Sequence, residues 1–140
     1  MPKFRRTAIP AVTAAVLTVA LATSSHAADN TTMASDNSCG IVTFTDYGDK
    51  FSFLDVCSDG RGVRLQYTNP TEGTPSTNDV RVNVDYTGGF TGYNQDDAWV
   101  YNTNMDEDAC FLFRVGLVNN GSYVSGSYGG WTTHNVCAAN

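Results

Sequence analysis

Two short segments of this 140-residue chain alternate apolar and polar residues without interruption. They cover residues 63–67 and 80–86, and in the second one Val80, Val82, Val84 and Tyr86 fall on one face. A period of two is typical of a β-strand that buries one face. Because the two segments lie close in sequence and share this pattern, we predict that they are neighbours in an antiparallel sheet.

The other strand candidates make the chain all-β. Segments 40–44, 50–56 and 98–101 are short, β-branched or aromatic, and bounded by turn residues. An apolar run over residues 110–118 stops at Asn119-Asn120-Gly121, residue types that tolerate the positive φ of a hairpin turn, and an aromatic-rich return strand follows. No apolar stripe at helical spacing occurs after residue 27. We therefore predict a small antiparallel β-sandwich or barrel.

The first 27 residues have the three parts of a secretory signal peptide: basic residues, an apolar segment over residues 9–22, and small residues at the cleavage position. The apolar segment contains Pro10 and is shorter than the roughly 20 residues needed to span a bilayer. We therefore predict a secreted, extracellular protein with a signal peptide over 1–27. A polar, flexible N-terminal arm is expected over 28–38, followed by a single all-β domain over 39–140.

Acidic residues dominate the chain beyond the predicted signal peptide. Three of the eight basic residues and none of the 14 acidic ones lie in residues 1–27, which leaves five Lys and Arg against 14 Asp and Glu, a formal charge of −9. Such a surface repels phosphate backbones and anionic lipids, so we predict neither nucleic acid nor membrane as a partner. The acidity itself fits solubility outside the cell.

Four cysteines follow the predicted signal peptide: Cys39, Cys57, Cys110 and Cys137. An even number in an exported chain indicates two disulfides, for which three pairings are possible. We favour Cys39–Cys57 and Cys110–Cys137, because each pair brackets one hairpin-like segment. No Cys-x-x-Cys motif or Cys/His cluster occurs, so we predict no metal site and no cofactor.

Residue types that support catalysis are sparse. His134 is the only histidine after residue 27, and no Gly-x-Ser-x-Gly motif accompanies it. Paired carboxylates occur at 96–97 and 106–108, but they fit solvated turns and lack the pattern of a calcium-binding loop. We predict a non-enzymatic protein; the alternative is a small secreted hydrolase that uses His134 or these acidic loops.

Aromatic residues interleaved with Gly, Asn and Asp offer rigid apolar area with polar neighbours, which suits a sugar or a protein partner. These residues are Tyr93, Trp99, Tyr101, Tyr123, Tyr128 and Trp131. About half of them should pack in the core, since alternate residues of a strand point inward. One hypothesis is a carbohydrate-binding module in which Tyr93, Trp99 and Trp131 form a stacking platform.

The chain resembles the tendamistat family, small exported actinobacterial β-sandwich inhibitors of α-amylase. The resemblance lies in the short interval from Cys39 to Cys57, in the Val-x-Leu-x-Tyr strand at 63–67 followed by Thr-Glu-Gly at 71–73, and in a glycine-rich last interval ending at Cys137. It implies that the first cysteine pairs with the second and the third with the fourth. Two features depart from the family. Its Trp-Arg-Tyr triplet is missing from the first disulfide loop, and the interval from Cys57 to Cys110 is longer by about a hairpin.

These features lead to one functional prediction and one alternative. We predict a monomeric binding protein that inhibits a secreted hydrolase, either an α-amylase or a protease. The first disulfide loop is expected to present Tyr47, Lys50 and Phe51 on a rigid turn, which keeps the entropic cost of binding low. The partner is then an extracellular protein; in the alternative it is a polysaccharide bound by the aromatic platform.

Overall fold

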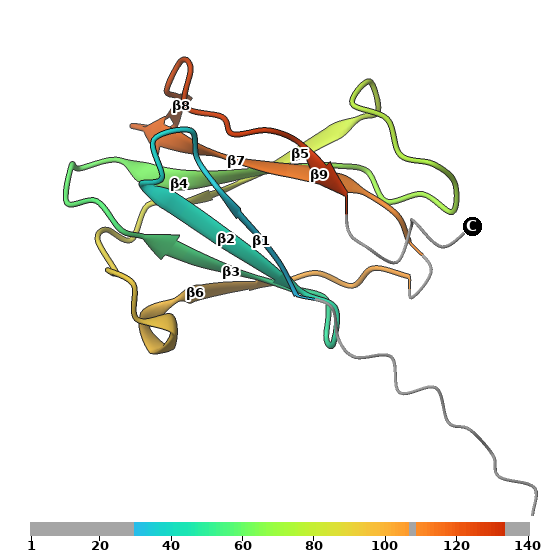
Figure 1. Cartoon of the computed structure of the whole chain (residues 1–140), viewed down its shortest axis with the longest axis horizontal. Coiled ribbons are helices and arrows are strands. Elements are labelled where there is room, and N and C mark those ends of the chain that lie inside the picture. Colours follow the sequence, from blue (N-terminus) through green and yellow to red (C-terminus); the bar gives the residue numbers. More distant parts are fainter. Residues whose placement is uncertain (1–29, 107–108, 134–140) are drawn as a thin grey trace, which may run out of the picture.

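Two antiparallel sheets pack face to face in this protein, which confirms the predicted β-sandwich (Figure 1). The computed structural model describes residues 30–106 and 109–133. The predicted signal peptide, His134 and Cys137 lie outside the described residues, as does part of the acidic loop at 106–108. Within the described ranges, no helix is both long and apolar enough to cross a membrane.

Sheet A contains four strands in the order β1-β2-β3-β6. Their bounds are Thr31–Ala34 for β1, Gly40–Thr45 for β2, Lys50–Asp55 for β3 and Trp99–Asn102 for β6. Sheet B has the order β5-β4-β7-β8, and β9 also pairs with β7. Its strands are β4 (Gly62–Thr68), β5 (Arg81–Tyr86), β7 (Leu112–Asn119), β8 (Ser122–Tyr123) and β9 (Thr132–Thr133). A 3-10 helix, η1 (Gln95–Asp97), precedes β6.

The two alternating segments form β4 and β5 and pair antiparallel, as predicted. The inward-facing side chains of β5 are Val82, Val84 and Tyr86, which pack against the core. The prediction was wrong for Val80, whose side chain is 76% exposed. The carbonyl of Val80 accepts a hydrogen bond from the Asn69 backbone amide at 2.7 Å. Val80 thus belongs to the connection that leads into β5.

The polar N-terminal segment is not a flexible arm throughout, contrary to the prediction for residues 28–38. Strand β1 pairs with β2 along four residues and covers its otherwise free edge. The hydroxyls of Thr32 and Thr43 lie 2.9 Å apart on the outer face, and Met33 packs against the core from the other face. The composition did not predict this strand, because only one of its four side chains is a large apolar residue. Backbone pairing with β2 supplies most of its contacts.

The core lies between the sheets and is built from five fully buried phenylalanines, contributed by β2, β3, β7 and the residue before β7. They are Phe44, Phe51, Phe53, Phe111 and Phe113. Phe51 and Phe53 share the inner face of β3, because residues two apart in a strand point to the same side. Burying each such ring contributes roughly 2 to 3 kcal/mol, so this cluster is a principal source of stability.

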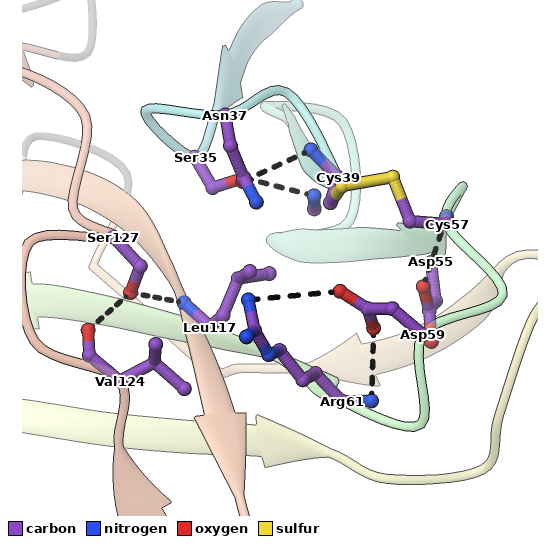
Figure 2. Close-up of polar contacts among 11 residues, drawn as sticks. Ser35, Asn37, Cys39, Asp55, Cys57, Asp59, Arg61, Leu117, Val124 and Ser127 are labelled. Carbon is purple, nitrogen blue, oxygen red and sulfur yellow. Dashed lines mark hydrogen bonds and ion pairs between the residues drawn. A yellow bond between two sulfur atoms is a disulfide. The ribbon is translucent and has the colours of Figure 1, made fainter.

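The predicted disulfide Cys39–Cys57 is present and closes the open end of the β2–β3 hairpin (Figure 2). Next to it, the Val56 amide donates a hydrogen bond to the Cys39 carbonyl at 2.9 Å. Cys110 is also disulfide-bonded. Its predicted partner, Cys137, lies outside the described residues, so the second pairing stays a prediction.

Candidate binding surfaces

The tip of the β2–β3 hairpin holds Tyr47, the first residue of the predicted presenting loop. Gly48 and Asp49 adopt left-handed backbone conformations, with φ of 86° and 46°. The Asp49 carbonyl accepts hydrogen bonds from the backbone amide of Thr103 at 2.8 Å and from its hydroxyl at 2.6 Å. The turn is therefore tied to the end of β6. Tyr47 is 83% exposed on this fixed turn.

The other two predicted residues of the loop have different environments. Lys50 begins β3, where it pairs with Thr45 and Asn102, and its side chain is half-buried. Phe51 is 0% exposed and packs against Phe44 with ring centroids 4.7 Å apart. The prediction that Phe51 contacts a partner was wrong, because Phe51 shares the inward face of its strand with Phe53. Of the three predicted residues, Tyr47 and Lys50 therefore remain available at the tip.

The three rings of the hypothesised sugar platform do not come together. Tyr93 is 73% exposed in the loop before η1. Trp99 stacks on Tyr86 with ring centroids 5.7 Å apart, and Tyr86 lies on the inner face of sheet B. Trp131 instead contacts Arg81, which points to the outer face of the same strand. The two tryptophans therefore lie on opposite faces of sheet B.

The outer face of sheet B carries a continuous row of stacked groups that we call the arginine–aromatic stack. Its members are Tyr123, Tyr128, Arg114, Trp131 and Arg81. The ring centroids of Tyr123 and Tyr128 are 4.4 Å apart, and the rings are nearly parallel. The Arg114 guanidinium carbon lies 3.9 Å from the Tyr128 centroid and 4.4 Å from that of Trp131. The Arg81 guanidinium carbon lies 5.5 Å from the Trp131 centroid. Two arginines and three rings thus form one contiguous surface.

Cross-strand pairing fixes Arg114 at the centre of this stack. Gln66 on β4 is directly paired with Asn83 on β5 and with Arg114 on β7. The Gln66 side-chain oxygen accepts hydrogen bonds from Nε and Nη2 of Arg114 at 3.0 and 2.7 Å. Its amide nitrogen donates to the Asn83 oxygen at 2.8 Å. Because all three residues occupy outward positions of adjacent strands, the period of two alone brings them into one row.

A glycine on β7 makes room for Tyr128. A Cβ at Gly116 would lie 2.6 Å from Cδ1 and 2.8 Å from Cε1 of Tyr128, so one edge of the ring rests on the bare backbone. The chain between β8 and β9 is held over the sheet on either side of this contact. The Ser127 hydroxyl accepts a hydrogen bond from the Leu117 amide at 2.8 Å, as Figure 2 shows, and the Gly129 amide donates to the Val115 carbonyl at 2.9 Å.

The charges on this face are not balanced. Arg64 makes a bidentate ion pair with Asp85, with both nitrogen–oxygen distances at 2.6 Å, and this bond raises the pKa of Arg64. Arg81 donates from Nε and Nη2 to the Thr77 carbonyl. Across residues 30–106 and 109–133, no carboxylate lies within 4.0 Å of Arg81 or Arg114. Within these ranges, the guanidinium groups of Arg81 and Arg114 therefore have no counter-ion.

The pKa values of the stack reflect burial and these charges. Burial lowers the pKa of Arg114, and the neighbouring positive charge of Arg81 lowers it further, while Tyr128 and Tyr123 act in the opposite direction. Burial raises the pKa of Tyr128, and the guanidiniums of Arg64 and Arg114 oppose that rise. Burial shifts both pKa values in this way because it removes water from the charged form of each group, which favours the neutral form.

A cavity of about 520 Å³ opens at the disulfide end of the sandwich, bordered by Asp55, Arg61 and Phe90 among others. Burial raises the pKa of Asp55. Its carboxylate accepts a hydrogen bond from the Cys57 amide at 3.3 Å, and its carbonyl accepts hydrogen bonds from the amides of Thr91 and Gly92. These bonds give Asp55 a role in ordering the surrounding loops. The described part of the chain contains no group of three His, Cys, Asp or Glu placed to hold a metal ion.

Sequence reasoning missed Arg81, Arg114 and Gln66 as site residues, although it listed Tyr123, Tyr128 and Trp131 among aromatic residues suited to a sugar or a protein partner. The alternation of β4 and β5 places Gln66 and Arg81 on the solvent face, so a polar outer face could have been predicted. Their assembly with Tyr128 could not, since it depends on the path of the chain between β8 and β9. Comparison of the chain with protein-family models, curated proteins and solved structures finds no match.

Proposed function

We propose that this protein is an exported, non-enzymatic binding protein that inhibits a secreted hydrolase through the tip of the β2–β3 hairpin. The observation that carries the proposal is Tyr47, an aromatic side chain 83% exposed on a turn whose backbone is fixed. The disulfide closes one end of the hairpin, and Thr103 holds the other. A rigid aromatic anchor loses little conformational entropy when it binds.

Lys50 offers one positive charge to the cleft of a glycoside hydrolase. Such enzymes place two carboxyl groups on either side of the scissile bond. Lys50 follows Tyr47 by three residues and is the one cation of a turn that also holds Asp46 and Asp49. Tyrosine is one of the residue types most enriched at interface hot spots.

The resemblance to the tendamistat family supports an α-amylase as the target, and the missing Trp-Arg-Tyr triplet weighs against it. The same three residue types do occur together elsewhere, as Trp131, Arg114 and Tyr128 of the arginine–aromatic stack. They come from separate segments of sheet B. The class of hydrolase must therefore be found by experiment, with proteases included beside α-amylases.

The proposal is tested by incubating the purified protein at micromolar concentration with a panel of secreted α-amylases and proteases. We expect concentration-dependent inhibition of at least one enzyme. Thr43→Ala, on the outer face of sheet A, serves as a control variant and should inhibit equally. If no enzyme of the panel is inhibited, the proposed function is wrong.

The polysaccharide alternative required Tyr93, Trp99 and Trp131 to form one platform, and the geometry does not support this, because Trp99 and Trp131 lie on opposite faces of sheet B. It retains a direct test with insoluble polysaccharides. Retention of the wild-type protein, together with its loss in a folded Trp131→Ala variant, would replace the inhibitor proposal with a carbohydrate-binding function.

A further inference from the structure

We propose that the arginine–aromatic stack on the outer face of sheet B is a second binding surface, which recognises an Asp- or Glu-bearing segment of a partner protein. This surface is distinct from the hairpin tip, since Tyr47 belongs to sheet A and the stack to the outer face of sheet B. The inference therefore does not require the inhibitor function to be correct.

In the described part of the chain, Arg81 and Arg114 each keep one nitrogen available to a ligand. Arg114 donates to Gln66 from Nε and Nη2, and Arg81 donates to Thr77 from the same two atoms. Among the contacts of the described chain, neither Nη1 has a hydrogen-bond partner. Gln66 holds the Arg114 guanidinium in place before any ligand arrives. A carboxylate oxygen can thus be bound by charge-assisted hydrogen bonds with little reorganisation.

Basic residues are concentrated on this face of a protein that is otherwise rich in acidic residues. Three of the five basic residues after residue 27 lie here, namely Arg64, Arg81 and Arg114. Among residues 30–106 and 109–133, a carboxylate pairs with Arg64 but with neither Arg81 nor Arg114. Arg81 and Arg114 both border Trp131 and repel each other. An anion bound to the outward nitrogens of both guanidiniums would relieve that repulsion. A negatively charged segment is therefore the complementary partner of this patch, in a protein whose overall charge is strongly negative.

The stacking favours a protein partner over an acidic sugar. One face of the Tyr128 ring is covered by Arg114 and the other by Tyr123, because one face of a six-membered ring cannot hold both groups at 3.9 and 4.4 Å. That ring has no free face on which a sugar could stack. Tyr, Trp and Arg are also the residue types most enriched at protein–protein hot spots. We therefore assign the carboxylate to a protein segment.

The test uses the two tryptophans of the chain as separate reporters. The ¹⁵N-labelled protein is titrated with a hexaglutamate peptide at low salt, with hexaglutamine as the uncharged control and oligogalacturonate as the acidic sugar. We expect hexaglutamate to shift the indole N–H signal of Trp131 in a saturable manner. The indole signal of Trp99, on the opposite face of the sheet, should stay unchanged, and hexaglutamine should shift neither signal.

Two charge-matched variants complete the test. Arg114→Gln removes the central charge while leaving a donor for Gln66, and it should weaken hexaglutamate binding at least tenfold. Arg61→Gln makes the same change in net charge at a residue that pairs with Asp59 at the disulfide end of the sandwich, and should bind within twofold of the wild type. No response of Trp131 in the wild-type protein, or equal weakening by both variants, would overturn the inference. Binding of oligogalacturonate as tight as that of hexaglutamate would overturn the assignment to a protein partner.

Discussion

The hairpin tip and the arginine–aromatic stack are two exposed surfaces built in opposite ways. The tip comes from one stretch of chain, in which a turn between two paired strands presents Tyr47 and Lys50. The stack combines outward side chains of β5 and β7 with rings from the chain around β8 and β9. A local turn can be recognised in a sequence, whereas a surface assembled from distant segments appears only in the folded protein.

The two surfaces also differ in how they are held. The tip depends on the hairpin ladder, the disulfide and the bonds from Thr103 to Asp49. The stack depends on side chains, above all on Gln66 and on the space above Gly116. Substitutions can therefore test the contributions of the core, the tip and the stack independently.

The largest effect is expected from a residue that sequence analysis assigned to the tip. Phe51→Ala should lower the free energy of unfolding by about 3 to 5 kcal/mol, because it leaves a cavity among the buried rings of both sheets. Its neighbour provides the control, since Lys50→Ala should change stability by only about 0.5 kcal/mol. Urea unfolding measures both. A small effect of Phe51→Ala would mean that the ring is not part of the core.

The disulfide of the hairpin should come second. Cys39→Ala/Cys57→Ala removes a cross-link between residues separated by 18 positions, which lowers stability by about 3 kcal/mol in the chain-entropy model. The stack lies on the other sheet and should be unaffected. Below the unfolding transition, the indole signal of Trp131 should keep its wild-type position. A displaced Trp131 signal in the folded variant would show that the two surfaces are coupled.

Gly116→Ala should have an intermediate effect that is confined to the stack. The added methyl group would overlap one edge of the Tyr128 ring, at a cost of about 1 to 3 kcal/mol. Gly130→Ala is the matched control, since a Cβ there meets no atom within 4 Å. Thermal unfolding gives the stability of each variant, and the Trp131 indole signal reports on the stack. Equal stability of both variants would contradict the close packing of Tyr128 on β7.

The smallest effect concerns the pKa of Tyr128. Burial raises this pKa above 10.0, so the folded state binds its proton more tightly than the unfolded chain does. Tyr128 therefore contributes stability below pH 10, and this contribution is lost as the pH rises through the folded-state pKa. Arg114→Gln removes a positive charge that favours the tyrosinate, so the pKa of Tyr128 should rise further. A ¹³C NMR titration between pH 8 and 12 measures the change, with Arg61→Gln as the control; a decrease would be incompatible with Arg114 over the ring.

Much of the fold could be predicted because its signals are local. Alternation located β4 and β5, the Asn120-Gly121 turn located the β7–β8 hairpin, and bracketing of a hairpin identified Cys39–Cys57. Strand β1 was missed because its side chains are mostly polar and its role is to pair with an edge. Phe51 was misplaced because a residue next to a turn was taken as part of the tip, although its position in β3 points it inward.

The candidate sites were harder to predict from the sequence than the fold, because most of their contacts join segments that are distant in the sequence. Tyr47 was predicted correctly as exposed, since turn geometry requires nothing of its side chain. Arg114 gave no signal, because an arginine between apolar strand residues fits any solvent-facing position. Its significance depends on Gln66, Tyr128 and Trp131, which are separated from it by up to 48 residues and meet only when both neighbouring segments have folded.

The most direct test of the proposed function is the inhibition constant of the tip variant Tyr47→Ala/Lys50→Ala against a hydrolase identified by the panel. If the tip is the contact surface, we expect inhibition to weaken by at least about 2 kcal/mol, which corresponds to roughly 30-fold. Stability should change by only about 0.5 kcal/mol, since neither side chain belongs to the buried core. Undiminished inhibition by the folded double variant would contradict a contact through the hairpin tip.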